Sequence, residues 1–148
     1  MADGSRISFR RGAADRTRAL ALFNRRAEIL WFGFEGSFGA DEAIIRLTAL
    51  PEGMLGGGGA VALNGGVIAA GFDAAVVLTG LGHYDTDTVV TLNLAVQFLN
   101  LARPSPSLAF RAWATRTTRH VCFVEGRLGD GEAVFASCTG MVMPVYAG

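Results

Sequence analysis

A ten-residue stretch near the middle of the chain, NGGVIAAGFD at residues 64–73, holds residue types that could attack a carbonyl group. Two glycines, Gly65 and Gly66, open a segment that is otherwise apolar apart from the carboxylate of Asp73. If the segment is a helix, its first N–H groups lack partners within the helix and can bind an oxygen that carries negative charge. A lone carboxylate in such a helix is costly unless something pairs with it or uses it. Asp73 is therefore a candidate base or nucleophile.

We expect this helix to run from residue 65 to about residue 82, where Gly80 and Gly82 mark its end. A helix that is apolar on all sides is normally buried, so we expect Asp73 to be buried as well. Two simpler interpretations stay open. Asp73 could pair with an arginine, and the glycines could serve only close helix packing.

The segments around the helix predict an α+β fold. A surface helix is expected at residues 13–27, and residues 29–38 fit a short helix followed by a loop. Strands are expected at residues 43–50, 88–99, 108–117, 120–129 and 133–143. Consecutive strands with short connections favour an antiparallel meander, and the apolar helix is the only available cover for its open face. We therefore expect a curved antiparallel sheet around a central helix, in one domain over residues 1–148 whose first 12 residues form a flexible tail.

The composition limits the possible functions. The basic and acidic residues balance at 13 each, so no net positive charge argues for nucleic acid. The N-terminus lacks the apolar core of a signal peptide, and no apolar segment is long enough to span a bilayer. We therefore expect a soluble, cytoplasmic protein without membrane or nucleic-acid partners. Hydrophobic residues make up 51% of the chain, which suggests that apolar surface is buried between subunits.

Cofactor and metal chemistry have little support in the sequence. Cys122 and Cys138 have no neighbouring ligand at metal spacing and form no disulfide framework. His83, Asp85 and Asp87 lie close together, but their spacing fits no specific metal site. We expect no metal and no cofactor.

Three stretches, taken in order, resemble the hotdog-fold acyl-CoA thioesterases of the phenylacetate-degradation (PaaI-like) branch. They are NGGVIAAGFD at 64–73, TLNLAVQFLNLARP at 91–104 and RTTRHVCFVEGRLGDGEAVFASCTG at 116–140. The resemblance covers about residues 43–143. It implies the hotdog fold, an acyl-CoA substrate and hydrolysis of the thioester bond.

The resemblance also implies roles for individual residues. Asp73 takes the place of the family's catalytic carboxylate, and Gly65, with Gly66 beside it, takes that of the backbone amide that holds the thioester oxygen. Thr91 corresponds to a Ser or Thr that helps to position water. Asn64 stands where the family usually has His.

Three further positions concern substrate binding. The upstream loop position that the family often fills with Asn or Gln falls near Gly58. The family often places basic residues in the turn that Arg116 and Arg119 occupy here, which makes them candidates for the CoA phosphates. A solvated sheet edge is the simpler interpretation for both arginines.

The spacing of the candidate residues predicts more than one subunit. Gly65 and Asp73 are eight residues apart, or about 12 Å along a helix. A thioester carbonyl needs its oxyanion donors and its attacking group each within about 3 Å. Two antiparallel helices could supply both, with Gly65 and Gly66 from one chain and Asp73 and Thr91 from the other. We therefore expect a homodimer or a dimer of dimers, with Asp73 as either general base or nucleophile.

Two rival functions remain. A hotdog hydratase or dehydratase would pair the Asp with a His five residues on, where this chain has Leu78. A non-catalytic protein that binds acyl-CoA or an aromatic ligand is the other rival. The sequence does not identify the acyl group of the substrate. Four aromatic residues could line an aromatic pocket or simply belong to the core: Trp31, Phe32, Phe34 and Phe38.

Overall fold

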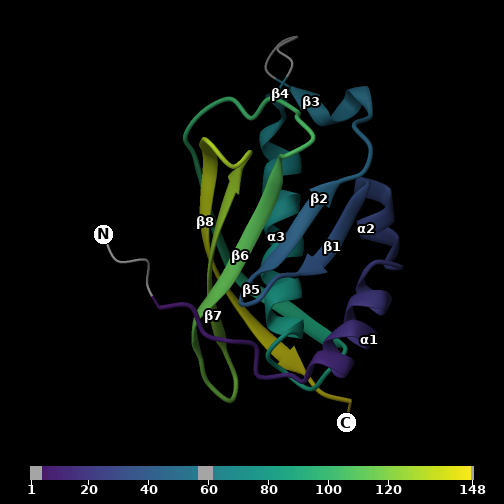
Figure 1. Ribbon diagram of the computed structural model, residues 1–148, viewed down its shortest axis with the longest axis vertical. Helices are drawn as coiled ribbons and strands as arrows, with labels where there is room; N and C mark the ends of the chain where they lie inside the picture. The colour runs from purple at the N-terminus through teal and green to yellow at the C-terminus, as the bar shows by residue number, and fades with distance from the viewer. Residues whose placement is uncertain (1–4, 57–61, 148) are drawn as a thin grey trace.

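The computed structural model describes residues 5–56 and 62–147 of the 148-residue chain. The main elements of the fold are one sheet and the long helix α3 at its centre (Figure 1). In chain order the elements are α1 (Ala13–Phe23), α2 (Ala27–Phe32), β1 (Phe34–Phe38), β2 (Ala43–Leu47), the 3-10 helix η1 (Glu52–Met54), β3 (Leu55–Gly56), β4 (Ala62–Leu63), α3 (Gly65–Leu81), β5 (Thr88–Phe98), β6 (Ala109–Thr117), β7 (Cys122–Gly129) and β8 (Val134–Val145).

Six strands form one antiparallel sheet in the order β1–β2–β6–β7–β8–β5, and β3 pairs separately with β4. The predicted α+β architecture is confirmed, but the simple four-strand meander is wrong. Strands β6, β7 and β8 do form a meander, whereas β5 pairs with β8 and not with β6. The connection at residues 99–108 carries the chain from β5 to the far side of that meander. Among the described strands, β5 therefore has a partner along one edge only.

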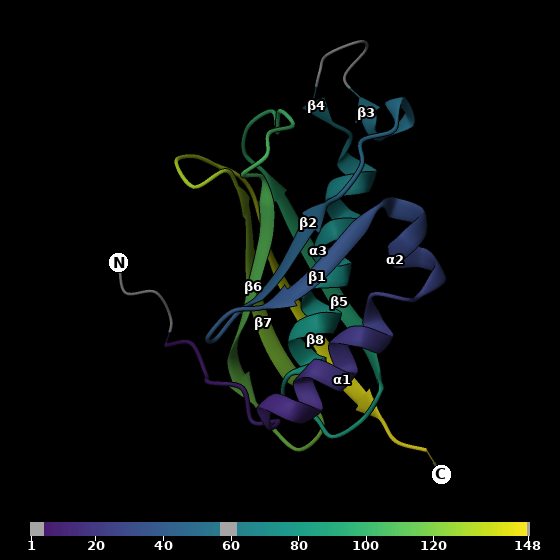
Figure 2. The same ribbon diagram turned by 45° about the vertical axis from the view of Figure 1, so that its right-hand side comes forward.

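Helix α3 lies in the hollow of the curved sheet, and two views show the strands wrapped around it (Figures 1 and 2). Close contact with the strands requires glycine at two positions of the helix. A Cβ atom on Gly71 would lie 2.2 Å from the Phe110 ring of β6, and one on Gly80 would lie 2.7 Å from Val89 of β5. Within the described residues, no helix combines the length and apolar character needed to cross a bilayer.

Residues 29–38 differ in part from the expectation. The short helix is present as α2, but the expected loop is strand β1, which pairs antiparallel with β2. Gly33 ends α2 with a φ of +68°, a conformation that glycine adopts readily. A Cβ atom on Gly36 would lie 2.8 Å from the Leu78 side chain, so glycine lets β1 approach α3. These glycines serve a turn and a close contact, which a sequence pattern cannot distinguish from a loop.

Residues 5–12 lie against the body of the fold, where a flexible tail was expected. The backbone N–H of Ile7 donates to the carbonyl of Ala114 at 2.9 Å, and that of Arg11 donates to Gly82 at 3.1 Å. The Phe9 ring packs edge-on against Phe38, with centroids 5.0 Å apart. These apolar and backbone contacts hold the segment in place, so the expectation of a tail does not apply to residues 5–12.

Candidate active site

The structure brings two of the predicted site residues into direct contact. The hydroxyl of Thr91, on β5, donates a hydrogen bond of 2.6 Å to a carboxylate oxygen of Asp73, on α3. The two residues are 18 positions apart and meet because β5 runs alongside α3. One carboxylate oxygen is thereby fixed in direction, and the other is available for chemistry.

Asp73 is exposed within the protomer, so the expectation that it is buried is wrong for a single chain. The strands enclose most of α3 but leave the stripe that contains Asp73 uncovered, although the helix sequence is apolar on nearly all sides. The simpler interpretation, an ion pair with an arginine, has no support: the part of the chain that the structure describes holds no ion pair to Asp73.

Asn64 fixes the N-terminal end of α3 through both ends of its amide. Its side-chain oxygen accepts a hydrogen bond of 2.8 Å from the backbone N–H of Val67, which is an N-cap. Its side-chain nitrogen donates to the carbonyl of Gly53 at 3.2 Å, and its backbone N–H donates to that of Met54 at 2.9 Å. The start of α3 is thus tied to η1 by Asn64.

The first two N–H groups of α3, those of Gly65 and Gly66, are left without an acceptor among residues 5–56 and 62–147. Both glycines are exposed. No acidic residue occupies the first turn, so the partial positive charge of the helix terminus has no counter-charge there. This end of the helix can bind a carbonyl oxygen that gains negative charge.

The protomer does not bring these amides to Asp73. Helix α3 is continuous from Gly65 to Leu81, so Gly65 and Asp73, which are eight positions apart, are separated by about 12 Å along the axis. One chain therefore presents two candidate half-sites: the amides of Gly65 and Gly66 at the start of α3, which we call the oxyanion half-site, and the carboxylate of Asp73 farther along the helix.

A hollow of about 520 Å³ adjoins the oxyanion half-site. Gly66 and Val67 line it from α3, Met54 lines it from η1, and Trp31 and Phe32 line it from α2. A smaller groove of about 190 Å³ contains Asp73 and shares Phe32 with the larger hollow. An apolar hollow thus lies next to the start of α3, whereas the groove at Asp73 is lined by Arg26 and Glu28 as well as by apolar side chains.

The aromatic residues of this region divide between the two roles that the sequence left open. Phe34 is 4% exposed and belongs to the core, and Phe38 packs on Phe9. Trp31 is 77% exposed and stands edge-on to Phe32, with centroids 4.8 Å apart. Trp31 lines a pocket because its side chain is exposed and because η1 lines the same hollow. Neither feature can be seen in the sequence.

The candidates for CoA phosphates lie away from the oxyanion half-site. Arg116 and Arg119 are exposed at the β6–β7 turn, where the Arg116 guanidinium lies 5.9 Å from the centre of the Phe123 ring. The hydroxyl of Tyr84, just beyond α3, donates to Thr118 in this turn at 2.9 Å. The arginines therefore adjoin the C-terminal end of the helix. Gly58 lies outside the described residues.

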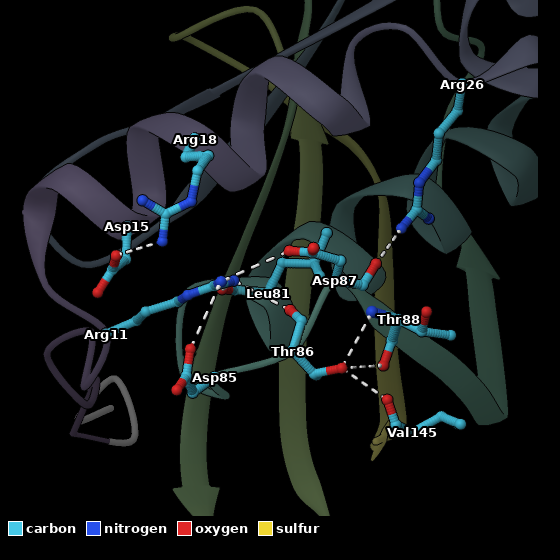
Figure 3. Close-up of polar contacts among 10 residues, drawn as sticks. All are labelled: Arg11, Asp15, Arg18, Arg26, Leu81, Asp85, Thr86, Asp87, Thr88 and Val145. Carbon is cyan, nitrogen blue, oxygen red and sulfur yellow. Dashed lines mark hydrogen bonds and ion pairs between the residues drawn. The ribbon is translucent and has the colours of Figure 1, made fainter. Parts of the chain in front are cut away.

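The C-terminal end of α3 is closed by Arg11, which lies in the segment that the sequence suggested would be a flexible tail. Its guanidinium donates to the carbonyls of Leu81 and Thr86 at 3.2 and 3.0 Å. It also forms ion pairs with Asp85 and Asp87 at 3.8 and 3.6 Å (Figure 3). A buried cation thus meets the negative end of the helix dipole. No local pattern marks this role, because Leu81 is 70 residues away.

His83, just beyond the C-terminal end of α3, is buried, and neither ring nitrogen has a hydrogen-bond partner among the described residues. Burial, together with the charges of Arg10 and Arg16, lowers the pKa of His83 from 6.5 to about 4. The two aspartates nearest to it in sequence are engaged with Arg11. In the described part of the chain, no three His, Cys, Asp or Glu side chains gather closely enough to hold a metal ion.

Comparison with known proteins finds a family model that matches part of the chain. The model of the thioesterase superfamily matches residues 62–134, which contain α3, β5, β6 and β7. The match therefore includes the helix start, Asp73 and Thr91. No curated protein matches the chain significantly.

Solved structures share the fold at low sequence identity. A thioesterase family protein from Silicibacter pomeroyi is 20% identical, with a TM-score of 0.76 over 92% of this chain and 100% of its own. The E. coli PaaI protein, from the phenylacetic acid degradation operon, is 13% identical, with a TM-score of 0.75 over 91% and 96%. A phenylacetic acid degradation-related protein from Ralstonia eutropha JMP134 is 22% identical, with a TM-score of 0.69 over 88% and 99%. The predicted hotdog fold is confirmed.

Proposed function

We propose that this chain, whose residues 62–134 match the model of the thioesterase superfamily, hydrolyses acyl-CoA thioesters at composite sites built by two copies of itself. The observation that carries the proposal is the division of one helix into two half-sites. Gly65 and Gly66 offer free amides at its start, and Asp73 offers an exposed carboxylate about 12 Å along it. The fold that the chain shares with the E. coli PaaI protein supports the phenylacetate-degradation branch.

The amides act on the carbonyl oxygen. As the carbonyl carbon becomes tetrahedral, its oxygen takes up negative charge, and the N–H groups of Gly65 and Gly66 stabilise that charge with the aid of the helix dipole. Asn64 is a positioning residue in this scheme, because its side chain caps the same helix turn and holds η1 against it.

Asp73 acts on the carbonyl carbon, directly or through water. As a general base, it takes a proton while the water oxygen bonds to the carbon. The intermediate then expels the CoA thiolate, which accepts the proton, and the acyl group leaves as the acid. As a nucleophile, an Asp73 oxygen bonds to the carbonyl carbon and the CoA thiolate leaves, which gives a mixed anhydride. Water then hydrolyses the anhydride, which releases the acid, restores the Asp73 carboxylate and supplies the proton for the thiolate. In both routes Thr91 holds one carboxylate oxygen at 2.6 Å and leaves the other to react.

The free edge of β5 supports pairing between two copies. Val90, Leu92 and Phe98 on this strand are 38%, 49% and 58% exposed, which is unusual for large apolar side chains in a sheet. Antiparallel pairing of β5 with its symmetry mate would continue the sheet and set two α3 helices side by side in opposite directions. The start of each helix would then face the middle of the other, where Asp73 lies.

A subunit-mixing experiment tests the composite site. Gly65→Pro removes one amide donor, and proline suits the first position of a helix. The extended backbone of Asn64, with ψ of 155°, suits a residue before proline. We expect Gly65→Pro to lower kcat about 100-fold or more, in the range known for loss of one oxyanion donor. Gly65→Ala keeps the amide and is the matched control.

Mixed dimers of Gly65→Pro and Asp73→Asn chains, purified with two different tags, then decide the arrangement. If each site takes its amides and its carboxylate from different chains, one site of the mixed dimer carries both changes and the other carries neither. The mixed dimer should therefore release CoA at about half the wild-type rate, although each variant alone is nearly inactive. A mixed dimer as inactive as its parents would contradict the composite site.

A further inference from the structure

We infer that the 520 Å³ hollow beside Gly66 holds the acyl group, and that it selects uncharged, apolar acyl groups, with Trp31 as a specificity-determining residue. The inference rests on the proposed function, because it assumes that the thioester oxygen lies on the helix amides. A thioester held there places its acyl group within reach of the hollow that Gly66 lines.

The residues that line the hollow explain why it would select uncharged acyl groups. Trp31, Phe32, Pro51, Met54 and Val67 supply apolar surface, and no charged side chain is among the described lining residues. The volume is within the range of small-molecule pockets. An acyl group that ended in a carboxylate would lose its hydration there and find no counter-charge, which is costly.

The polar side chain of Asn64, which lines the hollow, is already engaged. The Asn64 amide donates to the Gly53 carbonyl and accepts from the Val67 N–H. A polar acyl substituent would therefore have to displace these bonds, which also hold the start of α3. Selection for apolar acyl groups and support of the oxyanion amides thus depend on the same residue.

Trp31 is the wall residue that can be changed with least harm to the fold, because 77% of it is exposed. Leu30, its neighbour on α2, is 63% exposed but does not line the hollow. The pair gives a matched test: Trp31→Arg brings a cation to the hollow, whereas Leu30→Arg brings the same charge to the same helix outside it.

The test compares kcat/KM for hexanoyl-CoA and adipoyl-CoA, which have acyl chains of equal length and differ in a terminal carboxylate. We expect wild type to favour hexanoyl-CoA by about 100-fold. Trp31→Arg should reduce this ratio about tenfold or more by pairing with the carboxylate. Leu30→Arg should leave it within about twofold. Because both substrates carry the same CoA phosphates, the ratio cancels any general attraction of CoA to the new charge.

The outcomes separate this inference from the proposed function. Equal hydrolysis of both substrates by wild type would overturn the selection and leave the thioesterase activity in place. An equal change in the ratio for both arginine variants would overturn the role of Trp31. Release of CoA from neither substrate would overturn the proposed function and this inference with it.

Discussion

The two ends of α3 are built in opposite ways. At the C-terminal end, the Arg11 guanidinium is buried, donates to two carbonyls and pairs with two aspartates. Residues 5–12 cover this end through backbone hydrogen bonds and the Phe9 ring. At the N-terminal end, Gly65 and Gly66 are exposed, their amides lack acceptors within the described residues, and a hollow opens beside them.

This contrast suggests that the C-terminal end of α3 contributes to stability and that its N-terminal end is available for binding and chemistry. A helix has partial negative charge at its C-terminal end and partial positive charge at its N-terminal end. The chain neutralises the negative end with its own arginine. It leaves the positive end without an acidic side chain in the first turn, so a ligand can use it. Changes at the closed end should therefore affect folding, and changes at the open end should affect turnover.

The largest effect is expected from Asp73→Asn, which removes the carboxylate at the open half of the helix. We expect kcat to fall about 1000-fold, within the range for loss of a general base. The melting temperature should hardly change, because Asp73 is exposed. Release of thiol from acyl-CoA and a thermal melt measure the two quantities. Thiol release equal to that of wild type would exclude Asp73 as the catalytic carboxylate.

Arg11→Met should show the reverse pattern at the closed end. Loss of the buried guanidinium leaves the carbonyls of Leu81 and Thr86 without their donor, and we expect the free energy of unfolding to fall by about 3 kcal/mol. In conditions where the variant is folded, kcat/KM should stay within about twofold of wild type. Urea unfolding checks the first quantity. Arg18→Met, which breaks an exposed ion pair to Asp15, is the control and should cost about 0.5 kcal/mol or less.

Acidification should weaken the closed end through His83. The pKa of His83 is lowered in the folded state from 6.5 to about 4, so the unfolded chain takes up the proton first. The stabilising contribution of neutral His83 is complete above pH 6.5 and is lost as the pH falls toward 4. This loss amounts to about 3 kcal/mol at most.

Because carboxylates also titrate in this range, the measurement is the difference between wild type and His83→Leu in urea unfolding at pH 7 and pH 4.5. The variant should lose less stability than wild type between these two conditions. Parallel losses in both proteins would show that His83 does not supply the pH dependence.

The smallest effect is expected from Asn64, which links the helix start to η1. Asn64→Ala should lower the free energy of unfolding by about 1 kcal/mol through loss of the N-cap. Asn64→Asp keeps the acceptor for the Val67 N–H but cannot donate to Gly53. Aspartate should therefore restore stability but not kcat, if the tie to η1 positions the oxyanion amides. Equal kcat for Asn64→Asp and wild type would limit Asn64 to its role as a cap.

The parts of the site that the sequence predicted are those that lie along one helix. Gly65, Gly66 and Asp73 keep their spacing in any continuous helix, so their separation could be calculated without a structure. The placement of Asp73 and Thr91 in one site came from resemblance, and the hydrogen bond between them is a finding of the structure. The exposure of Asp73 could not be predicted, because an apolar helix does not reveal which stripe the sheet leaves uncovered.

Other features depend on contacts between distant segments. The role of Arg11 requires Leu81, 70 residues away, and the free edge of β5 follows from the crossing at residues 99–108. Strand β1 was missed because Gly36 serves a close contact with α3, whereas glycine in a sequence pattern suggests a loop.

The sequence by itself determined the central helix, its glycine start, its single carboxylate and their resemblance to the thioesterases, because these depend on residue type and local spacing. Only the tertiary structure decided which end of that helix is covered by other segments, that the Asp73 side chain is exposed, and where an apolar hollow adjoins the amides. Those features arise where segments far apart in the chain pack together, and local patterns do not encode such contacts.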